Sequence, residues 1–229
     1  MSTPEDVLKI IAEREITFVD FRFTDTLGRE HHLTTPAHAV DEDRFESGVA
    51  FDGSSLPGWK GIEASDMLLI PDAKTARMDP FREEPTLILT CDVVEPSDLK
   101  GYDRDPRSLA KRAEAYLRPS GLGDTAYFGP EPEFFVFDGI TWNDDMSGSF
   151  VKIRSEEAPW SRGLELNGNN LGHRPGVKGG YVPVSPTDSF ADLRAEMCLL
   201  MEQQGVPVEI HHHEVAAPGQ LEIGTRFST

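Results

Sequence analysis

Two glutamates interrupt an otherwise apolar stretch, FGPEPEFFVFD, at residues 128–138. Its aromatic and β-branched side chains predict a buried strand, yet Glu131 and Glu133 stand in the middle with only Pro132 between them. Side chains two apart on a strand point to the same face. Two like charges among phenylalanines repel each other and resist desolvation, so this pattern requires a group that neutralises them.

A second pair of carboxylates lies in PVEIHHHEVAAPGQLEIGTRF, residues 207–227. Two strand-like runs flank Pro218 and Gly219, which predicts a β-hairpin. A loop of residues 217–219 would place Glu214 directly opposite Glu222. Cross-strand Cβ atoms lie roughly 4.5–5.5 Å apart, and like charges at that spacing are destabilising.

Four carboxylates converging on one sheet would form a site for a hard divalent cation, because Mg²⁺ and Mn²⁺ prefer oxygen ligands. The simpler alternative is that both pairs are solvated side chains at sheet edges. The aromatic neighbours of Glu131 and Glu133 favour the metal site, since a bound cation would remove the repulsion between the carboxylates.

Three consecutive histidines, His211, His212 and His213, precede Glu214. On a strand, His211 and His213 would share one face with Glu209, and His212 would share the face of Glu214. Structural and ligand roles both remain open for the triplet. Zinc is the less favoured ion, because the sequence has no CxxC or HExxH pattern.

The elements that must position these residues alternate between short strands and helices. Thr3 can cap a helix that begins at Pro4, with Asp6 in the capping-box position. Apolar patterning predicts strands at residues 16–23, 29–35, 67–72 and 86–94, and helices at residues 41–47, 106–117 and 187–204. The pattern predicts an α+β protein with a sheet-rich domain at residues 1–104 and a second domain at residues 105–229.

Composition excludes several classes of function. The chain has 229 residues, 38% of them hydrophobic, which is typical of a globular protein with a sizeable core. A net charge of −18 argues against binding to nucleic-acid phosphates. No apolar run reaches the roughly 20 residues of a membrane helix, and no signal peptide is visible, so we expect a cytoplasmic protein without a membrane partner.

Five segments occur in the order VDFRFTDTLGREHH, FDGSSLPGWKGIEASDMLLIPD, FGPEPEFFVFD, KGGYVPVSPTDSFADLRAEM and EIHHHEVAAPGQLEIGTRF. In these segments the chain resembles the N-terminal half of the bacterial-type (type I) glutamine synthetases, and the resemblance covers nearly all of its length. Leu221 and Ser228 depart from residues frequent in the family. Family members are also longer than this chain, which stops at Thr229.

The resemblance implies a fold and an activity. The fold would be a β-grasp-like N-terminal domain followed by the first part of the catalytic domain, an antiparallel sheet with helices. The activity would be ATP-dependent ligation of glutamate and ammonium to glutamine through a γ-glutamyl phosphate, with two divalent ions, Mg²⁺ or Mn²⁺, and ATP as co-substrate. The assembly would be a homo-oligomer, a dodecamer of two stacked six-membered rings.

The resemblance also implies metal ligands and a nucleotide contact. Glu133, Glu214 and Glu222 resemble the ligands of one ion, and Glu131 resembles a ligand of the second. Further ligands of that second ion would lie beyond Thr229. Glu209 resembles a nucleotide contact.

Other positions resemble the adenine and ammonium sites of the family. Phe227 would lie near the adenine. Asp52 and Ser55 of FDGSS, with Tyr181 and Glu214, resemble the ammonium pocket, where Asp52 would act as cation binder and general base in the site of a neighbouring subunit. Without the resemblance, Asp52 would be interpreted as an ordinary Asx turn.

Two alternatives to glutamine synthesis stay open. One is a relative that ligates glutamate to an organic amine such as a polyamine; the other is a non-catalytic assembly protein that retains half of the fold. We also expect the 229-residue chain alone to make little or no glutamine. The second ion would lack ligands, and the basic residues that neutralise phosphoryl oxygens in the family would be missing.

Overall fold

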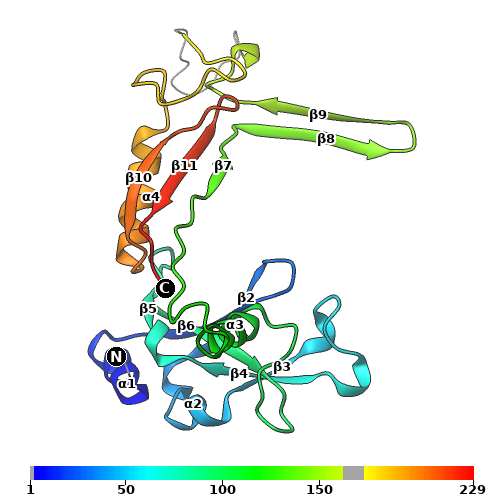
Figure 1. The fold of residues 1–229 in the computed structure, drawn as a ribbon, viewed down its shortest axis with the longest axis vertical. Coiled ribbons are helices and arrows are strands. Elements are labelled where there is room, and N and C mark those ends of the chain that lie inside the picture. Colours follow the sequence, from blue (N-terminus) through cyan, green and yellow to red (C-terminus); the bar gives the residue numbers. More distant parts are fainter. Residues whose placement is uncertain (1–2, 162–172) are drawn as a thin grey trace. The chain divides into compact units, whose positions relative to one another are not determined.

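The computed structural model describes residues 3–161 and 173–229 (Figure 1). The chain forms two compact units, Met1–Ala126 and Tyr127–Thr229. The division into domains at residue 104 stays a prediction.

A mixed sheet forms the centre of the first unit. Its strands are β1 (Phe18–Thr24), β2 (Glu30–Pro36), β3 (Val49–Asp52), β4 (Asp66–Pro71), β5 (Arg77–Met78) and β6 (Thr86–Val94). The order is β2-β1-β6-β4-β3, and β5 pairs with β6. The central pair β1 and β6 is parallel, and the other pairs are antiparallel.

Three helices of the first unit begin or end at residues that the sequence predicts. Helix α1 (Pro4–Glu13) starts with a complete capping box, in which the Thr3 N–H donates to Asp6 and the Asp6 N–H donates to Thr3. Helix α2 (Asp43–Ser47) ends at Gly48, whose φ of +75° favours glycine. Helix α3 (Pro106–Ser120) begins at Pro106 as predicted and extends three residues beyond the predicted end, up to Gly121.

Apolar side chains fill the interior of the first unit. Phe21, Met67 and Leu89 are fully buried. Trp59 is 5% exposed, and its ring lies 5.2 Å from that of Tyr102 between ring centroids. The alternating pattern of strands β1, β4 and β6 therefore directs their apolar faces into one core.

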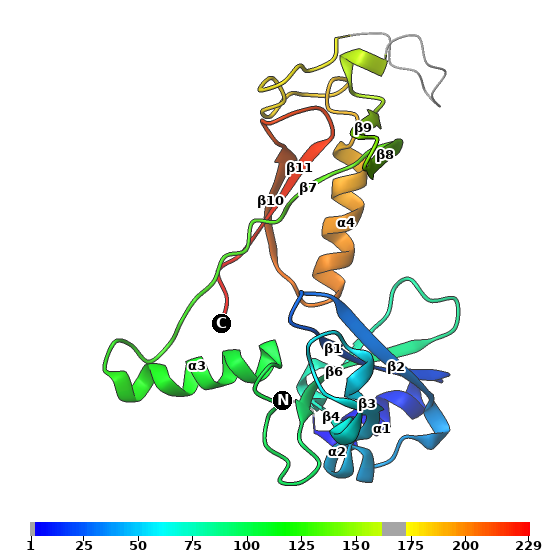
Figure 2. The ribbon, with the colours of Figure 1, turned by 90° about the vertical axis from the view of Figure 1, so that its right-hand side faces the viewer.

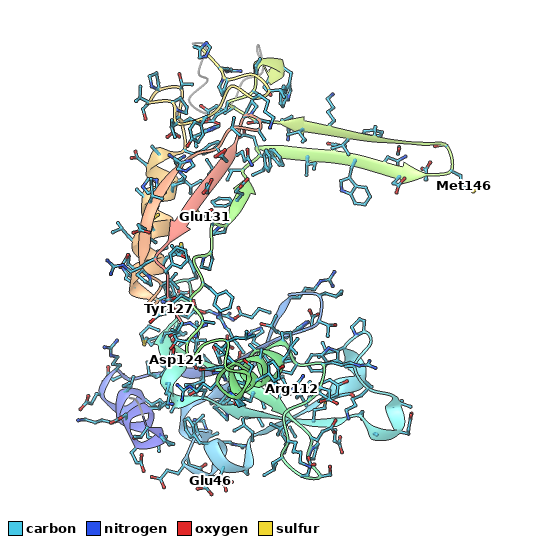
Figure 3. The ribbon with its side chains drawn as sticks, in the orientation of Figure 1. Glu46, Arg112, Asp124, Tyr127, Glu131 and Met146 are labelled. Atoms are coloured by element: carbon cyan, nitrogen blue, oxygen red, sulfur yellow. The ribbon has the colours of Figure 1, made fainter. Side chains whose placement is uncertain are left out.

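Within its described residues, the second unit contains two separate sheets, one α-helix and a short 3-10 helix at Pro159–Ser161. Strands β7 (Glu133–Phe135), β10 (Val208–His213) and β11 (Gln220–Thr225) form an antiparallel sheet in the order β10-β11-β7. Helix α4 (Ala191–Gln203) packs against β10 (Figure 2). Strands β8 (Gly139–Asp145) and β9 (Gly148–Arg154) form a hairpin with Met146 at its tip (Figure 3).

The predicted buried strand at residues 128–138 is wrong in length and burial. Only the three residues of β7 are strand, and Glu131, Pro132 and Glu133 are exposed. Pro130 and Pro132 have no N–H to donate, so the ladder cannot extend through them. Their carbonyls still accept from the N–H groups of Thr225 at 3.0 Å and Ile223 at 3.2 Å, so the segment runs beside β11.

Helix α4 starts at Ala191, later than the predicted residue 187, and its buried face is not purely apolar. Leu193 is 40% exposed, whereas Arg194 and Cys198 are buried. The reason is that Arg194 forms a buried ion pair with Asp188, at 2.5 Å between Nη2 and Oδ2, which occupies the inner face of the helix. Within the described residues, no helix has both the length and the apolar character that crossing a bilayer requires.

Candidate metal and substrate site

Strand β10 sends its three histidines to alternate faces. His212 lies on the same face as Glu214, whereas His211 and His213 point to the opposite face, toward α4 and the segments around it. The triplet therefore serves two purposes. One histidine joins the carboxylates, and two anchor the strand from behind.

His212, Glu214 and Glu222 form a cluster in the described part of the chain. One ligand atom from each residue lies within 4.8 Å of the others, a separation that a single metal ion could span. The His212 ring nitrogens lie 3.8 Å from Glu214 Oε2 and 3.7 Å from Glu222 Oε2. All three side chains are less than one-fifth exposed, so they retain access from solvent while being largely held by the protein.

The predicted pairing of Glu214 with Glu222 is wrong by two residues. His212 lies opposite Glu222, and the Glu214 N–H donates to the carbonyl of Gln220 at 2.9 Å. The connection is longer than predicted because the side chain of Gln220 accepts from the Ala216 N–H at 2.7 Å and closes a wider loop. A shift of two residues keeps every side chain on its face, so Glu214 and Glu222 still meet.

Glu133 approaches the cluster from the neighbouring strand. It lies opposite Glu222 in the pairing of β7 with β11. Its Oε2 accepts a hydrogen bond of 2.7 Å from the Gln220 amide, so Glu133 is directed to Gln220. Glu131 is two residues earlier, in the exposed segment before β7 (Figure 3).

Electrostatic repulsion at the cluster is visible in Glu222. Partial burial raises the pKa of its carboxyl, and repulsion from Glu214, Glu131 and Glu133 raises the pKa further, against the attraction of His212. The carboxyl of Glu222 is thus repelled by the other three carboxylates although they do not all touch it. Oxygen ligands with surplus negative charge fit Mg²⁺ or Mn²⁺.

Tyr181 lies beside the cluster. Its ring centroid is 5.7 Å from that of His212, with the rings nearly perpendicular. The backbone holds it there, because the N–H of the next residue, Val182, donates to the carbonyl of His213 at 3.1 Å. Two of the predicted ammonium-site residues, Tyr181 and Glu214, therefore lie on the same side of the β10–β11 hairpin.

Asp52 and Ser55 belong to the first unit and form a compact turn. Asp52 accepts from the Ser54 N–H at 2.8 Å, the Ser54 hydroxyl at 2.6 Å and the Ser55 hydroxyl at 3.0 Å. These hydrogen bonds, those from Ser54 foremost, lower the pKa of Asp52 and keep it ionised. The geometry is that of an Asx turn, and its exposed carboxylate is suited to binding a cation.

Glu209 and Phe227, the predicted nucleotide contacts, are both exposed. Glu209 lies where the pairing of β10 with β11 is interrupted between Val208 and Ile210. Phe227 is 69% exposed, and its ring packs on Gly129, where a Cβ would come within 3.0 Å of it. Glu209 and Phe227 therefore both lie at the end of the sheet that is far from the turn between β10 and β11.

The residues behind β10 are ones that sequence reasoning missed. The ring of His213 lies 2.7 Å from Glu157 between Nε2 and Oε2, with both side chains fully buried. Burial works against charge on both groups, but their hydrogen bond and mutual attraction lower the pKa of Glu157 and raise that of His213. The surrounding sequence, RSEEAPW, carries no pattern that singles out Glu157.

His211 has a different anchor. The Arg194 Nε donates to His211 Nδ1 at 3.3 Å, and Arg194 also pairs with Asp188. Burial and the neighbouring Arg194 lower the pKa of His211. Strict alternation along HHHE was the one signal in the sequence that separated His212 from its neighbours.

The fold and the candidate site define an α+β protein that carries carboxylates and a histidine together on an antiparallel sheet. Residues 15–96 match the model of the "Glutamine synthetase, beta-Grasp domain" family, and residues 103–229 match that of the "Glutamine synthetase, catalytic domain" family. The chain belongs to the glutamine synthetase family. The predicted β-grasp domain followed by the first part of a catalytic domain is confirmed.

Similar proteins of known sequence agree with this assignment but carry two names. The chain is 70% identical over 98% of its length to a 3-hydroxylaminophenol mutase of Cupriavidus pinatubonensis, and 60% identical over 99% of its length to a glutamine synthetase of Methylococcus capsulatus. The chain spans about half of these relatives, 48% of each.

A solved structure supports the fold alone. The cryo-EM structure of Plasmodium falciparum glutamine synthetase matches with a TM-score of 0.88 at 23% identity. The match covers 100% of this chain and 45% of that one.

Proposed function

We propose that this chain supplies part of the active site of a glutamate–ammonia ligase, which forms glutamine from glutamate, ammonium and ATP through a γ-glutamyl phosphate. The observation that carries the proposal is the cluster of His212, Glu214 and Glu222, with Glu133 on the adjoining strand. Its support is the match of residues 103–229 to the family's catalytic domain.

In this proposal the carboxylates hold two divalent ions. Glu133, Glu214 and Glu222 bind one ion, Mg²⁺ or Mn²⁺, and Glu131 binds the second. Such ions, when bound, neutralise the negative charge that develops on phosphoryl oxygens. Glu133 is ready to exchange its bond to Gln220 for a ligand role, because a single hydrogen bond of 2.7 Å holds its Oε2.

The ammonium site would combine Asp52 and Ser55 with Tyr181 and Glu214. Asp52 remains ionised because its pKa is lowered, so it attracts ammonium and then accepts the proton that the nitrogen must lose before it attacks. The proposal assigns Asp52 to the site of an adjacent copy in a homo-oligomer of two six-membered rings.

ATP would lie near the opposite end of the sheet from the hairpin turn. Glu209 offers a carboxylate to the ribose or metal-bound phosphates, and Phe227 offers an exposed ring for the adenine. Both residues are accessible, as a co-substrate site requires.

The test begins with Mn²⁺ binding, measured by electron paramagnetic resonance. The substitution Glu222→Gln removes one oxygen charge, so we expect Mn²⁺ affinity to fall by at least about tenfold, a loss typical even of residues one step further from a metal. Glu196→Gln is the matched control, because Glu196 is an exposed glutamate on α4. Equal affinity in both variants would refute the assignment of Glu222.

The activity test follows ATP-dependent product formation with ammonium and, in parallel, with polyamines. We expect glutamine from the protein as isolated from its source, and little from the 229-residue chain alone. A product formed only with polyamines would favour the amine ligase. Absence of any product, with the protein still assembling, would favour a non-catalytic role.

A second candidate activity rests on the 70% identity to the mutase. This identity exceeds the 58–60% found with several glutamine synthetases. A mutase rearranges its substrate without changing its mass. The experiment is therefore incubation with 3-hydroxylaminophenol in the absence of ATP, followed by chromatographic separation, with mass spectrometry to show that any new compound has the mass of the substrate.

A further inference from the structure

Glu157 is the buried centre of a group of four residues, which we call the Glu157 clamp: Glu157, Ser189, His213 and Gly219; Ser189 itself is exposed. Its Oε1 accepts from both the N–H and the hydroxyl of Ser189, each at 2.9 Å. Its Oε2 accepts from the Gly219 N–H at 2.8 Å and contacts His213 Nε2 at 2.7 Å. One carboxylate, 1% exposed, thus receives four hydrogen bonds.

The clamp joins segments that are far apart in sequence. Ser189 lies just before helix α4, His213 ends strand β10, and Gly219 immediately precedes strand β11. His213 extends the network, because its Nδ1 lies 2.7 Å from the carbonyl of Gly180. Two contacts of the clamp therefore fall on the two ends of the connection between β10 and β11, which carries Glu214.

The backbone around the clamp leaves little room for adjustment. A Cβ on Gly219 would lie 2.5 Å from the carbonyl oxygen of Val136, and the φ of Gly219 is +79°. A Cβ on Gly180 would lie 2.7 Å from the carbonyl oxygen of Glu214. Neither glycine position has room for a side chain, so the segments around the clamp are closely packed.

We propose that Glu157 is a positioning residue, which fixes Glu214 and Glu222 for metal binding by tying both ends of their connecting loop to Ser189, just before helix α4. It reaches Glu214 through His213, the residue directly before it, and it reaches the start of β11 through Gly219. This inference rests on the proposed role of Glu214 and Glu222 as ligands.

The clamp requires a carboxylate. Both ring nitrogens of His213 face oxygen atoms of Glu157 and Gly180, so both carry hydrogen and donate. In Glu157→Gln, the amide nitrogen faces a backbone N–H in either orientation, that of Gly219 at the place of Oε2 or that of Ser189 at the place of Oε1, donor against donor. A glutamine therefore keeps the shape but cannot hold the Gly219 N–H and the Ser189 N–H at the same time, and the tie between them is lost.

The test compares Glu157→Gln with wild type by hydrogen exchange and mass spectrometry. We expect faster exchange of the amides in residues 213–220, with the β8–β9 hairpin unchanged. We also expect about tenfold weaker Mn²⁺ binding and an altered Mn²⁺ resonance spectrum, because ligands held loosely bind in more than one geometry.

The matched control is Ile223→Ala, which destabilises the same unit by removing a buried side chain from β11 but leaves all four hydrogen bonds of the clamp. We expect any faster exchange in this variant to be spread over the strands of the unit rather than concentrated in residues 213–220, and the Mn²⁺ spectrum to be unchanged. If Glu157→Gln does not fold, Ser189→Ala removes one hydroxyl bond and should give a smaller change in the same direction.

The experiment distinguishes failure of the clamp from failure of the proposed metal site. Unchanged exchange in residues 213–220 of the folded Glu157→Gln or Ser189→Ala variant overturns the clamp, as does an equal change in Ile223→Ala. If the wild-type chain binds no Mn²⁺, the proposed metal site fails, but faster exchange limited to residues 213–220 still supports the clamp.

Discussion

The first unit has a large apolar core, in which Phe21, Met67 and Leu89 are fully buried, and it also buries four aspartates, Asp20, Asp25, Asp79 and Asp105. The second unit buries charged Glu157 and Arg194 among far fewer apolar side chains. Among the described residues of the second unit, the buried hydrophobic side chains are Ala158, Cys198, Leu221 and Ile223. Its buried polar residues are Ser155, Glu157, Ser161, Arg174, Asp188, Arg194, His213, Glu214 and Gln220.

This difference determines how the stability of each unit responds to pH and to substitution. Apolar burial has no proton to lose, so its contribution to stability depends little on pH but strongly on side-chain volume. Buried ionised groups contribute to stability only while the partner of each group is present and charged. The second unit carries this polar interior directly behind β10, the strand that presents His212 and leads into Glu214, so His212 and its neighbouring anchors share one strand.

The largest expected effect is a cavity in the first unit. Phe21→Ala removes a fully buried ring and should lower the free energy of unfolding by about 3–5 kcal/mol. Urea unfolding followed by Trp59 fluorescence measures it, in a background of Trp142→Phe and Trp160→Phe. Trp59 is 5% exposed, and the two replaced tryptophans are 68% and 55% exposed.

Phe81→Ala is the control for that prediction, because Phe81 is 78% exposed. Its effect should stay within about 0.5 kcal/mol. Similar losses in the two variants would show that the apolar core does not dominate the stability of the first unit.

The next effect is a pH dependence confined to the second unit. The folded pKa of His213 is raised, so its stabilising contribution is full below the ordinary value of 6.5 and is lost as pH rises from 6.5 through the folded pKa. In that range one proton accounts for up to about 1.4 kcal/mol per pH unit. The lowered pKa of Glu157 affects stability in a different pH range, since the stabilisation by Glu157 is lost only as pH falls below 4.5.

Methyl NMR signals of Ile223 and Val19 report the two units separately during urea unfolding at pH values above 6.5. The Ile223 transition should move to lower urea as pH rises, and His213→Gln should abolish that shift. A shift of the same size for Val19, or one that persists in His213→Gln, would contradict the assignment to His213.

The smallest effect is at the first helix. Thr3→Ala removes the hydroxyl that accepts from the Asp6 N–H and should cost about 1 kcal/mol in the Trp59 transition. Lys9→Ala, which breaks an exposed pair with Glu13 at 3.7 Å, should cost less than about 0.5 kcal/mol. The reverse order would mean that the capping box is not a stabilising feature of α1.

Local signals in the sequence predicted much of the first unit. The capping box at Thr3 and Asp6 depends on residues three apart, and Gly48 and Gly121 end helices through their own backbone angles. Such features need no information from distant residues, which is why they could be predicted. The strand at residues 128–138 failed for the opposite reason, because its length depends on which N–H groups β11 can pair with and on two prolines that offer none.

The candidate site was predictable in composition but not in arrangement. Period-two alternation placed Glu214 and Glu222 on one face, and it survives the two-residue error in pairing. His212 was left open as a ligand, because a histidine triplet alone does not distinguish a ligand from an anchor. Glu157 could not be found at all, since its partners are 32, 56 and 62 residues away.

The sequence by itself determined the faces of the strands, the helix caps and the abundance of carboxylates, because these follow from backbone geometry and side-chain type. Only the tertiary structure decided the register of the hairpin, the exposure of Glu131 and Glu133, and the pairing of Glu157 with His213. Those outcomes depend on which distant groups meet. A buried charge is tolerated only where the folded chain brings its partner to it.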